Sequence, residues 1–258
     1  MIPVRFIIEL GIFYFLITLI VVKEKRTYPF FNKSKEDWVI DLSGLLIQGF
    51  FIPLVGVAFL WGIYSQVFPT FKGALEIPAI LAFLLNFVLV DYIYYWFHRL
   101  YHKRSFWFLH AIHHSAPEMD ILNTSRNSLI SHFFLPYLWI NSWMLFWLSD
   151  PTPYLLALSV TAMLDLWRHS TLYPEKNHFL TKIIEFVFIT PRHHSWHHST
   201  YESRKFFGAN FVWWDYLHGT AKQIQNYPKD IGIPLRGSFQ DKLFSPWNLF
   251  KREAREER

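Results

Sequence analysis

The stretch DYIYYWFHRLYH, residues 91–102, decides the fold, because an apolar helix ends there in two histidines. The apolar run begins at Ile77 and continues to Phe97, and about 20 such residues are enough for one membrane crossing. His98 and His102 lie one helical turn apart, so on a helix they share a face. The segment therefore predicts an apolar helix that presents metal-binding side chains at its end.

Further apolar runs lie on both sides of this segment. Hydrophobic residues make up 52% of the 258-residue chain and charged residues only 17%, whereas an average globular chain carries about 25% charged residues. We therefore expect an all-α integral membrane protein with about four to five membrane-embedded helices and a cytosolic helical cap that carries a di-metal site. The further runs are Ile2–Val22, Trp38–Phe68, Ile130–Leu148 and Tyr154–Trp167.

The distribution of cations predicts the orientation of these helices. Lysine and arginine residues follow the first run closely, and such residues mark the cytoplasmic side of a membrane. With that assignment, every histidine cluster and the C-terminus fall on the cytoplasmic side of a multi-pass protein. Pro53 could kink the second run or split it into a hairpin, and the second run or the final pair could dip in without crossing. The cations are Lys23, Lys25, Arg26, Lys33 and Lys35.

No linker or repeat divides the chain, so we expect a single membrane domain over residues 1–258. Within it, residues 1–76 would form anchor helices, residues 77–220 the histidine-bearing domain and residues 221–258 a C-terminal tail. The segment Phe179–Ile189 is expected to be an amphipathic helix at the membrane interface.

Two more histidine clusters follow the first pair. Because successive helical residues point about 100° apart, adjacent histidines in these clusters point in different directions. The pattern fits two metal ions better than one, and each cluster could send imidazoles to both. The clusters are His110, His113 and His114, and then His194, His197 and His198, with His193 just before the last.

The chemistry of this set narrows the function. Imidazole binds iron, zinc, copper and nickel, so the pattern predicts two metals and favours iron only if redox chemistry with dioxygen is required. The absence of cysteine excludes thiolate zinc sites and cysteine-bound clusters. No dinucleotide fingerprint, Walker loop or nucleophile elbow appears. Reducing electrons must therefore come from a partner protein or a diffusible reductant, and nothing indicates a nucleic acid.

Two other functions use similar residues. A metal transporter or metal-binding membrane protein could hold ions on the same clusters, but it needs ionisable groups in mid-span, where Asn86 and Asp91 are nearly alone. A bis-histidine haem protein would need facing histidines deeper in the spans.

The three clusters, read together, resemble the fatty acid hydroxylase / sterol desaturase superfamily of membrane di-iron oxygenases. The shared pattern is H-x3-H, H-x2-H-H and H-x2-H-H, with the surrounding words DYIYYWFHR, WFLH, TPRHH and WDYLHGT, between about Phe83 and Thr220. The resemblance implies two iron ions, dioxygen as co-substrate, and hydroxylation or desaturation of an unactivated C–H bond in a bilayer lipid.

The same resemblance extends the expected site. It implies that His169 is a ligand and that His178 and His193 could be further ligands. Apart from the resemblance, Asp91 could accept a hydrogen bond from a ligand N–H, or it could be a polar residue for helix packing at the edge of the span. Arg99, Arg126 and Arg168 are expected to form salt bridges within the cap, and pairing with a lipid head group is the alternative. The segment Thr190–His198 and the sequence NTSR at residues 123–126 are most similar to the alkylglycerol monooxygenase branch, but that branch usually has glutamate where this chain has Lys103. The ether-lipid substrate and the pterin reductant of that branch are therefore left open.

Overall fold

In the computed structural model, the regular secondary structure of the described part of the chain is entirely helical, which confirms the expected all-α class. The structure describes residues 33–172, 179–224 and 226–250, together with residues 11, 14–16, 18, 19 and 22. No β-strand occurs among these residues; the only extended pairings are isolated bridges such as that between Leu75 and Leu148.

One continuous helix of 33 residues spans Lys35–Val67. The side chain of Ser34 caps its start by accepting from the Asp37 amide at 3.1 Å. Pro53 does not split the run into a hairpin, because two wide π-helical turns flank it and leave room for a ring without an N–H. The successive parts are α2 (Lys35–Leu46), η3 (Ile47–Phe51), α3 (Ile52–Leu54), η4 (Val55–Leu60) and α4 (Trp61–Val67).

A second long helix of 23 residues spans Ala79–Tyr101 and ends in the first histidine pair. It consists of α5 (Ala79–Leu84), η6 (Leu85–Val90) and α6 (Asp91–Tyr101). Among the described residues, this helix and Lys35–Val67 are the two that are long and apolar enough to cross a membrane.

The last two predicted runs form a shorter antiparallel pair. A break at Leu135 separates α8 (Ser131–Phe134) from α9 (Pro136–Trp147), and α10 covers Thr152–Arg168. The 12 residues of α9 extend for only about 18 Å, less than the roughly 30 Å of a bilayer core. Whether this pair crosses a membrane therefore stays a prediction.

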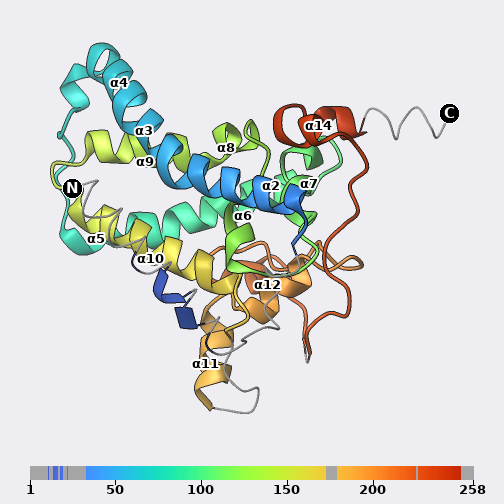
Figure 1. Cartoon of the computed structure of the whole chain (residues 1–258). Helices are drawn as coiled ribbons and strands as arrows, with labels where there is room; N and C mark the ends of the chain where they lie inside the picture. The colour runs from blue at the N-terminus through green and yellow to red at the C-terminus, as the bar shows by residue number, and fades with distance from the viewer. Residues whose placement is uncertain are drawn as a thin grey trace.

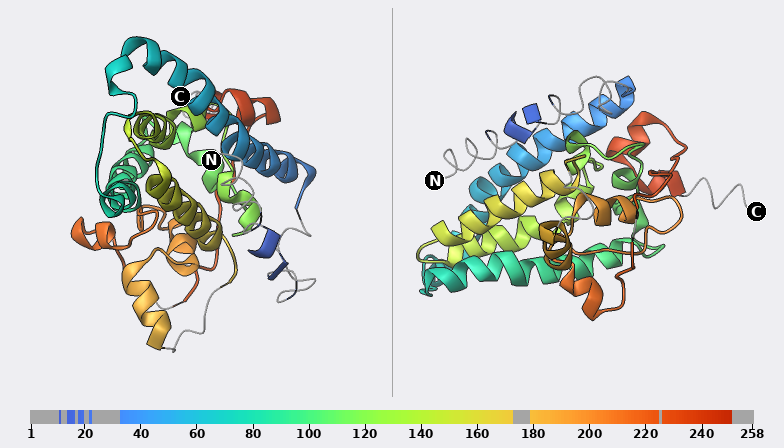
Figure 2. Two further views of the ribbon diagram at one scale, coloured as in Figure 1. Left: turned by 90° about the vertical axis from the view of Figure 1, so that its left-hand side faces the viewer. Right: turned by 90° about the horizontal axis from the view of Figure 1, so that it is seen from below.

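The long helices lie side by side, and the short elements gather at one end of them (Figures 1 and 2). At the other end, the turn η5 (Pro69–Phe71) leads to a segment bound to the end of α9: the Leu75 amide donates to Trp147 O at 2.9 Å. The short elements are η7 (Trp107–Leu109), α7 (Ala111–His114), η8 (Ile121–Ser125), α11 (Phe179–Val187), α12 (Pro191–His197), α13 (Trp213–Leu217) and α14 (Phe239–Phe244).

Some predictions concern residues outside the described part of the chain. These are most of the first apolar run with the cations Lys23, Lys25 and Arg26, the candidate ligand His178, and the end of the tail at residues 251–258.

Candidate metal centre

The nine histidines expected to bind metal come together in two buried groups. In each group, one ring nitrogen from every member lies within 4.8 Å of all the others. The first histidine group is His98, His102, His110, His114 and His197, and the second histidine group is His113, His169, His194 and His198.

The division between the groups follows helical geometry. His113 and His114 are adjacent in α7 but belong to different groups, and His197 and His198 at the end of α12 divide in the same way. The second and third clusters thus contribute to both groups, as expected. The expectation is wrong for the first cluster, because both of its histidines share one face of α6 and enter the first group.

Helix ends meet at this site. His102 caps the C-terminus of α6, His169 that of α10 and His198 that of α12. A helix C-terminus carries partial negative charge from its unpaired carbonyl groups, which favours a nearby cation. The backbone therefore adds an electrostatic preference for positive ions to a set of neutral side chains.

Hydrogen bonds to backbone carbonyls fix the orientation of four of the imidazoles. In the first group, His98 Nδ1 lies 2.8 Å from Phe207 O, and His197 Nδ1 lies 2.8 Å from Lys205 O. In the second group, His113 Nδ1 lies 3.3 Å from Arg126 O, and His169 Nδ1 lies 2.8 Å from Asp165 O. A carbonyl oxygen only accepts, so each of these Nδ1 atoms carries the proton.

This arrangement turns unprotonated nitrogens toward each other. A neutral imidazole has one N–H, so Nε2 of His113 and Nε2 of His169 both present lone pairs although they lie 3.4 Å apart. No hydrogen bond can join two lone pairs, whereas a shared cation satisfies both. The donor set therefore fits a metal ion.

Burial favours the neutral form of seven of the grouped imidazoles. Desolvation is the main cause that lowers the pKa of His197 to about 3. Desolvation, followed by the nearby histidines, also lowers the pKa of His113 well below its usual value. Neutral imidazole is the form that binds metal. The pKa is lowered well below its usual value for the same reasons in His102, His110, His114, His194 and His198.

Asp91 has a different role from the one expected. Its buried carboxylate accepts from the amides of Asn210 at 2.7 Å and Phe211 at 3.2 Å, and from the Trp214 indole at 2.7 Å. Among the described residues, no histidine donates to it. Asp91 lies two turns before His98 on α6, and therefore reaches the neighbouring loop rather than a ring.

That loop, residues 205–211, supports the first group from outside. Asp215 accepts from the amides of Phe207 at 2.8 Å and Gly208 at 3.0 Å, and burial raises the pKa of Asp215 to about 6. A Cβ at Gly208 would meet Phe211 O at 2.2 Å, so the tight turn requires glycine. The Phe207 ring packs 5.1 Å from His102, between centroids, and shields the group from water.

The remaining described residues that the sequence singled out lie around the two histidine groups and not within them. His193 lies outside both groups; its Nδ1 accepts from the Thr190 amide at 3.3 Å and caps α12. Arg168 forms a salt bridge with Asp165 at 2.6 Å, and Arg126 forms one with Asp41, as expected. Arg168 also donates a hydrogen bond to Ala209 O at 2.6 Å. Arg99 instead donates to the Tyr95 hydroxyl at 3.4 Å.

The sequence reasoning missed the groups that orient the imidazoles. Four of them are backbone carbonyls, which have no signature in the sequence. A fifth is the carboxylate of Asp165, which precedes His169 by one helical turn and lies 3.2 Å from His169 Nδ1. That spacing in an apolar run was a signal that could have found it.

Two buried histidine groups lie at the end of apolar helices that are long enough to cross a membrane. These features define a class of helical proteins whose candidate metal centre has two sites, each formed by imidazoles alone. Within that class, the chain belongs to the fatty acid hydroxylase family, whose family model matches residues 83–220. This confirms the resemblance seen in the histidine clusters.

The chain is similar to characterised lipid-modifying enzymes. It is 33% identical over 190 residues to the ornithine lipid hydroxylase OlsE of Rhizobium tropici, covering 70% of this chain and 54% of that protein. It is 28% identical over 143 residues to the alkylglycerol monooxygenase of Xenopus tropicalis (53% and 29%), and 26% identical over 174 residues to the human enzyme (64% and 37%). The chain thus spans about half or less of the length of these relatives. No solved structure matches it.

Proposed function

We propose that this protein is a non-haem di-iron oxygenase that hydroxylates, or desaturates, an unactivated C–H bond of a lipid. The observation that carries the proposal is the pair of buried histidine groups whose unprotonated nitrogens converge. The family membership and the lipid hydroxylase and monooxygenase relatives support the reaction class.

The first histidine group would hold one iron ion and the second group the other. Iron bound there would supply the activation of dioxygen and the oxidising power for the C–H bond. In hydroxylation, one oxygen atom enters the lipid and the other leaves as water, with two electrons and two protons from an external donor. In desaturation, the same donor and dioxygen remove two hydrogens from the lipid and form two waters.

The protein's own residues hold and shield this centre. The carbonyls of Phe207 and Lys205 keep the Nε2 atoms of His98 and His197 directed inward. The Phe207 ring, packed against His98, His102 and His197, excludes water from the first group. Such exclusion protects a reactive intermediate from solvent.

The substrate would enter from a bilayer, with the helices Lys35–Val67 and Ala79–Tyr101 as spans and the histidine groups on the cytoplasmic side. Apolar side chains on α11 support an interfacial position for that helix: Phe179 is 71% exposed and Phe186 65% exposed. Bulky apolar side chains at such exposure are typical of contact with lipid. The names of the relatives favour a polar lipid and leave its head group open.

The transporter alternative has less support. Asn86 donates to Asn141 at 3.2 Å, and the Tyr154 hydroxyl donates to the same amide oxygen at 2.8 Å. Asp91 accepts from the Asn210 amide in the loop at residues 205–211 and from the Trp214 indole on α13. These mid-span polar groups already have hydrogen-bond partners within the protein and are not free to form an ion path.

The proposal is tested by expressing the protein in a lipid-rich host beside a His98→Ala variant and comparing lipid masses and protein-bound iron. His218→Phe is the matched control, since His218 stacks on Tyr92 outside both groups. We expect a lipid that gains one oxygen, or loses two hydrogens, with the wild type and the control only. Full turnover after complete removal of iron would refute the di-iron assignment.

A further inference from the structure

The second histidine group has an outer support that comes from the beginning of the chain. His113 donates from Nδ1 to Arg126 O at 3.3 Å, and its Nε2 lies 3.1 Å from His198 Nε2 and 3.4 Å from His169 Nε2. The position of the Arg126 backbone therefore determines which way the His113 lone pair points.

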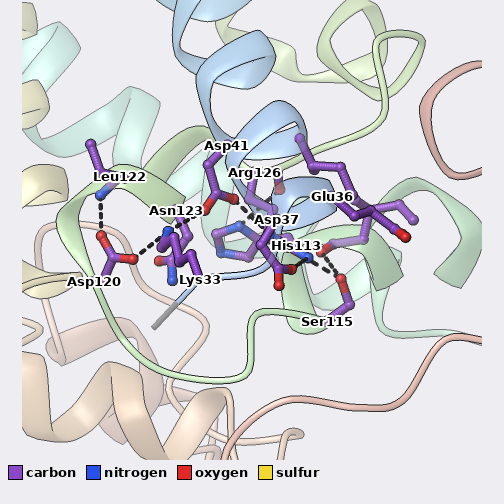
Figure 3. A network of polar contacts seen from close by, with 12 residues as sticks. Lys33, Glu36, Asp37, Asp41, His113, Ser115, Asp120, Leu122, Asn123 and Arg126 are labelled. Atoms are coloured by element: carbon purple, nitrogen blue, oxygen red, sulfur yellow. Dashed lines mark hydrogen bonds and ion pairs between the residues drawn. The ribbon is translucent and has the colours of Figure 1, made fainter. Parts of the chain in front are cut away.

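The Arg126 side chain fixes that backbone by bonding in three directions. Its guanidinium donates to Asp41 at 2.8 Å, to Asp37 at 2.7 Å and to Ser115 Oγ at 3.2 Å (Figure 3). Asp37 and Asp41 lie one turn apart on α2, while Ser115 directly follows the helix that carries His113. One planar guanidinium, itself 3% exposed, thus links α2 to the histidine helix.

A second cation completes the network. Lys33 forms ion pairs with both Asp41 and Asp120, and the Asp120 carboxylate also accepts from the Leu122 amide at 2.7 Å. Asp41 is fully buried and Asp120 is 1% exposed. Removing one partner from such a buried set leaves an uncompensated charge, so the set holds its geometry.

Backbone contact brings α2 against the same segment. A Cβ at Gly44 would lie 2.1 Å from Ser125 O, the residue just before Arg126. Only glycine allows this approach. Helix α2 therefore contacts the η8–Arg126 segment through both its backbone and its carboxylates.

The first histidine group has further outer contacts outside this network. Its outer contacts run to Phe207 O and Lys205 O on the loop held by Asp215. The two groups thus have separate supports in different parts of the chain.

We propose that Arg126, held by Asp37, Asp41 and Ser115, is a positioning residue for His113, and that helix α2 thereby tunes metal binding in the second histidine group alone. The inference rests on the proposed metal centre. Outer-shell partners of metal-binding histidines typically contribute about 10- to 100-fold to metal affinity, so loss of the network should weaken one of the two sites by roughly that factor.

The test is titration of the metal-free protein in detergent with Co²⁺, whose visible absorption reports its ligands, for the wild type, Arg126→Lys and Asp37→Asn. Arg126→Lys keeps the positive charge but loses the planar guanidinium, whose N–H groups reach several acceptors at once. Asp37→Asn changes a carboxylate that is 20% exposed, so the variant should fold even if the first does not. Glu36→Gln is the matched control: Glu36 is in the same turn of α2 but pairs with Lys242 at 2.6 Å, away from Arg126.

We expect two Co²⁺ sites in the wild type and in the control. In Asp37→Asn and Arg126→Lys, one site should weaken by about 10- to 100-fold while the other keeps its affinity. Equal weakening of both sites, or no change in either, with the wild type binding two ions, would overturn the positioning role. A wild type that binds no Co²⁺ would instead refute the metal centre, and the proposal with it.

Discussion

Replacing Gly44 by alanine should destabilise the protein, although alanine is the better helix former. A Cβ at this position would lie 2.1 Å from Ser125 O, and real Cβ atoms essentially never approach closer than 3.0 Å. The obstacle is backbone rather than a flexible side chain. Helix α2 and the Ile121–Ser125 segment must therefore separate by ~0.9 Å, the difference between those distances.

The magnitude follows from two opposing terms. Overpacking a rigid contact costs about 1–3 kcal/mol, and we take the upper end because neither backbone can rotate away. The helix propensity of alanine returns about 1 kcal/mol, which leaves a net loss of about 2 kcal/mol. For a chain of this size, that corresponds to a fall in Tm of about 4–8 °C.

Gly49→Ala is the matched control, because Gly49 lies in the same long helix with nothing within 4 Å of its added Cβ. At Gly49 alanine brings its higher helix propensity without a steric cost, so the free energy of unfolding should rise by up to about 1 kcal/mol. The assay is thermal unfolding of the metal-free protein in detergent, followed by circular dichroism of the helices. If Gly44→Ala proved as stable as Gly49→Ala, the close approach of α2 to Ser125 would be refuted.

Three further predictions concern the histidine groups. His102→Ala should lower bound metal by removing a ligand of the first group, whereas His193→Gln should keep it, because His193 caps α12 outside both groups; metal analysis of the purified variants compares them. Asp215→Asn should loosen the loop that holds His98 and weaken the first site by about 10- to 100-fold, which Co²⁺ titration would measure; selective weakening of the second site would contradict this. Finally, burial holds the pKa of group members such as His197, at about 3, below the unfolded value of 6.5. The unfolded chain then binds more protons between these values, so the metal-free protein should lose stability as the pH falls below about 6.5; a Tm that rose on acidification from pH ~7.5 to pH ~5 would show that the sign is wrong.

The linear order of residues was enough to predict which side-chain type makes up the site. Spacings of three and four residues place histidines on helix faces whatever the rest of the fold does, because that periodicity is local. Both long apolar helices and eight of the nine grouped histidines were therefore predicted from local patterns in the sequence, whereas His169 was predicted only from the family resemblance. The break at Leu135 was not predicted, although Pro136 inside an apolar run is a sequence signal for a helix boundary.

What the tertiary structure alone decided is which imidazoles share a group and what holds them. His110 and His194 enter different groups, although each opens a cluster with the same H-x2-H-H spacing. Carbonyls of Phe207 and Arg126 orient the rings, and a carbonyl is present at every residue, so no sequence pattern marks the ones that matter. Asp91 supports a loop more than a hundred residues away. Such pairings depend on long-range packing of side chains and backbone, whereas the histidine spacing depends only on the turn of a helix.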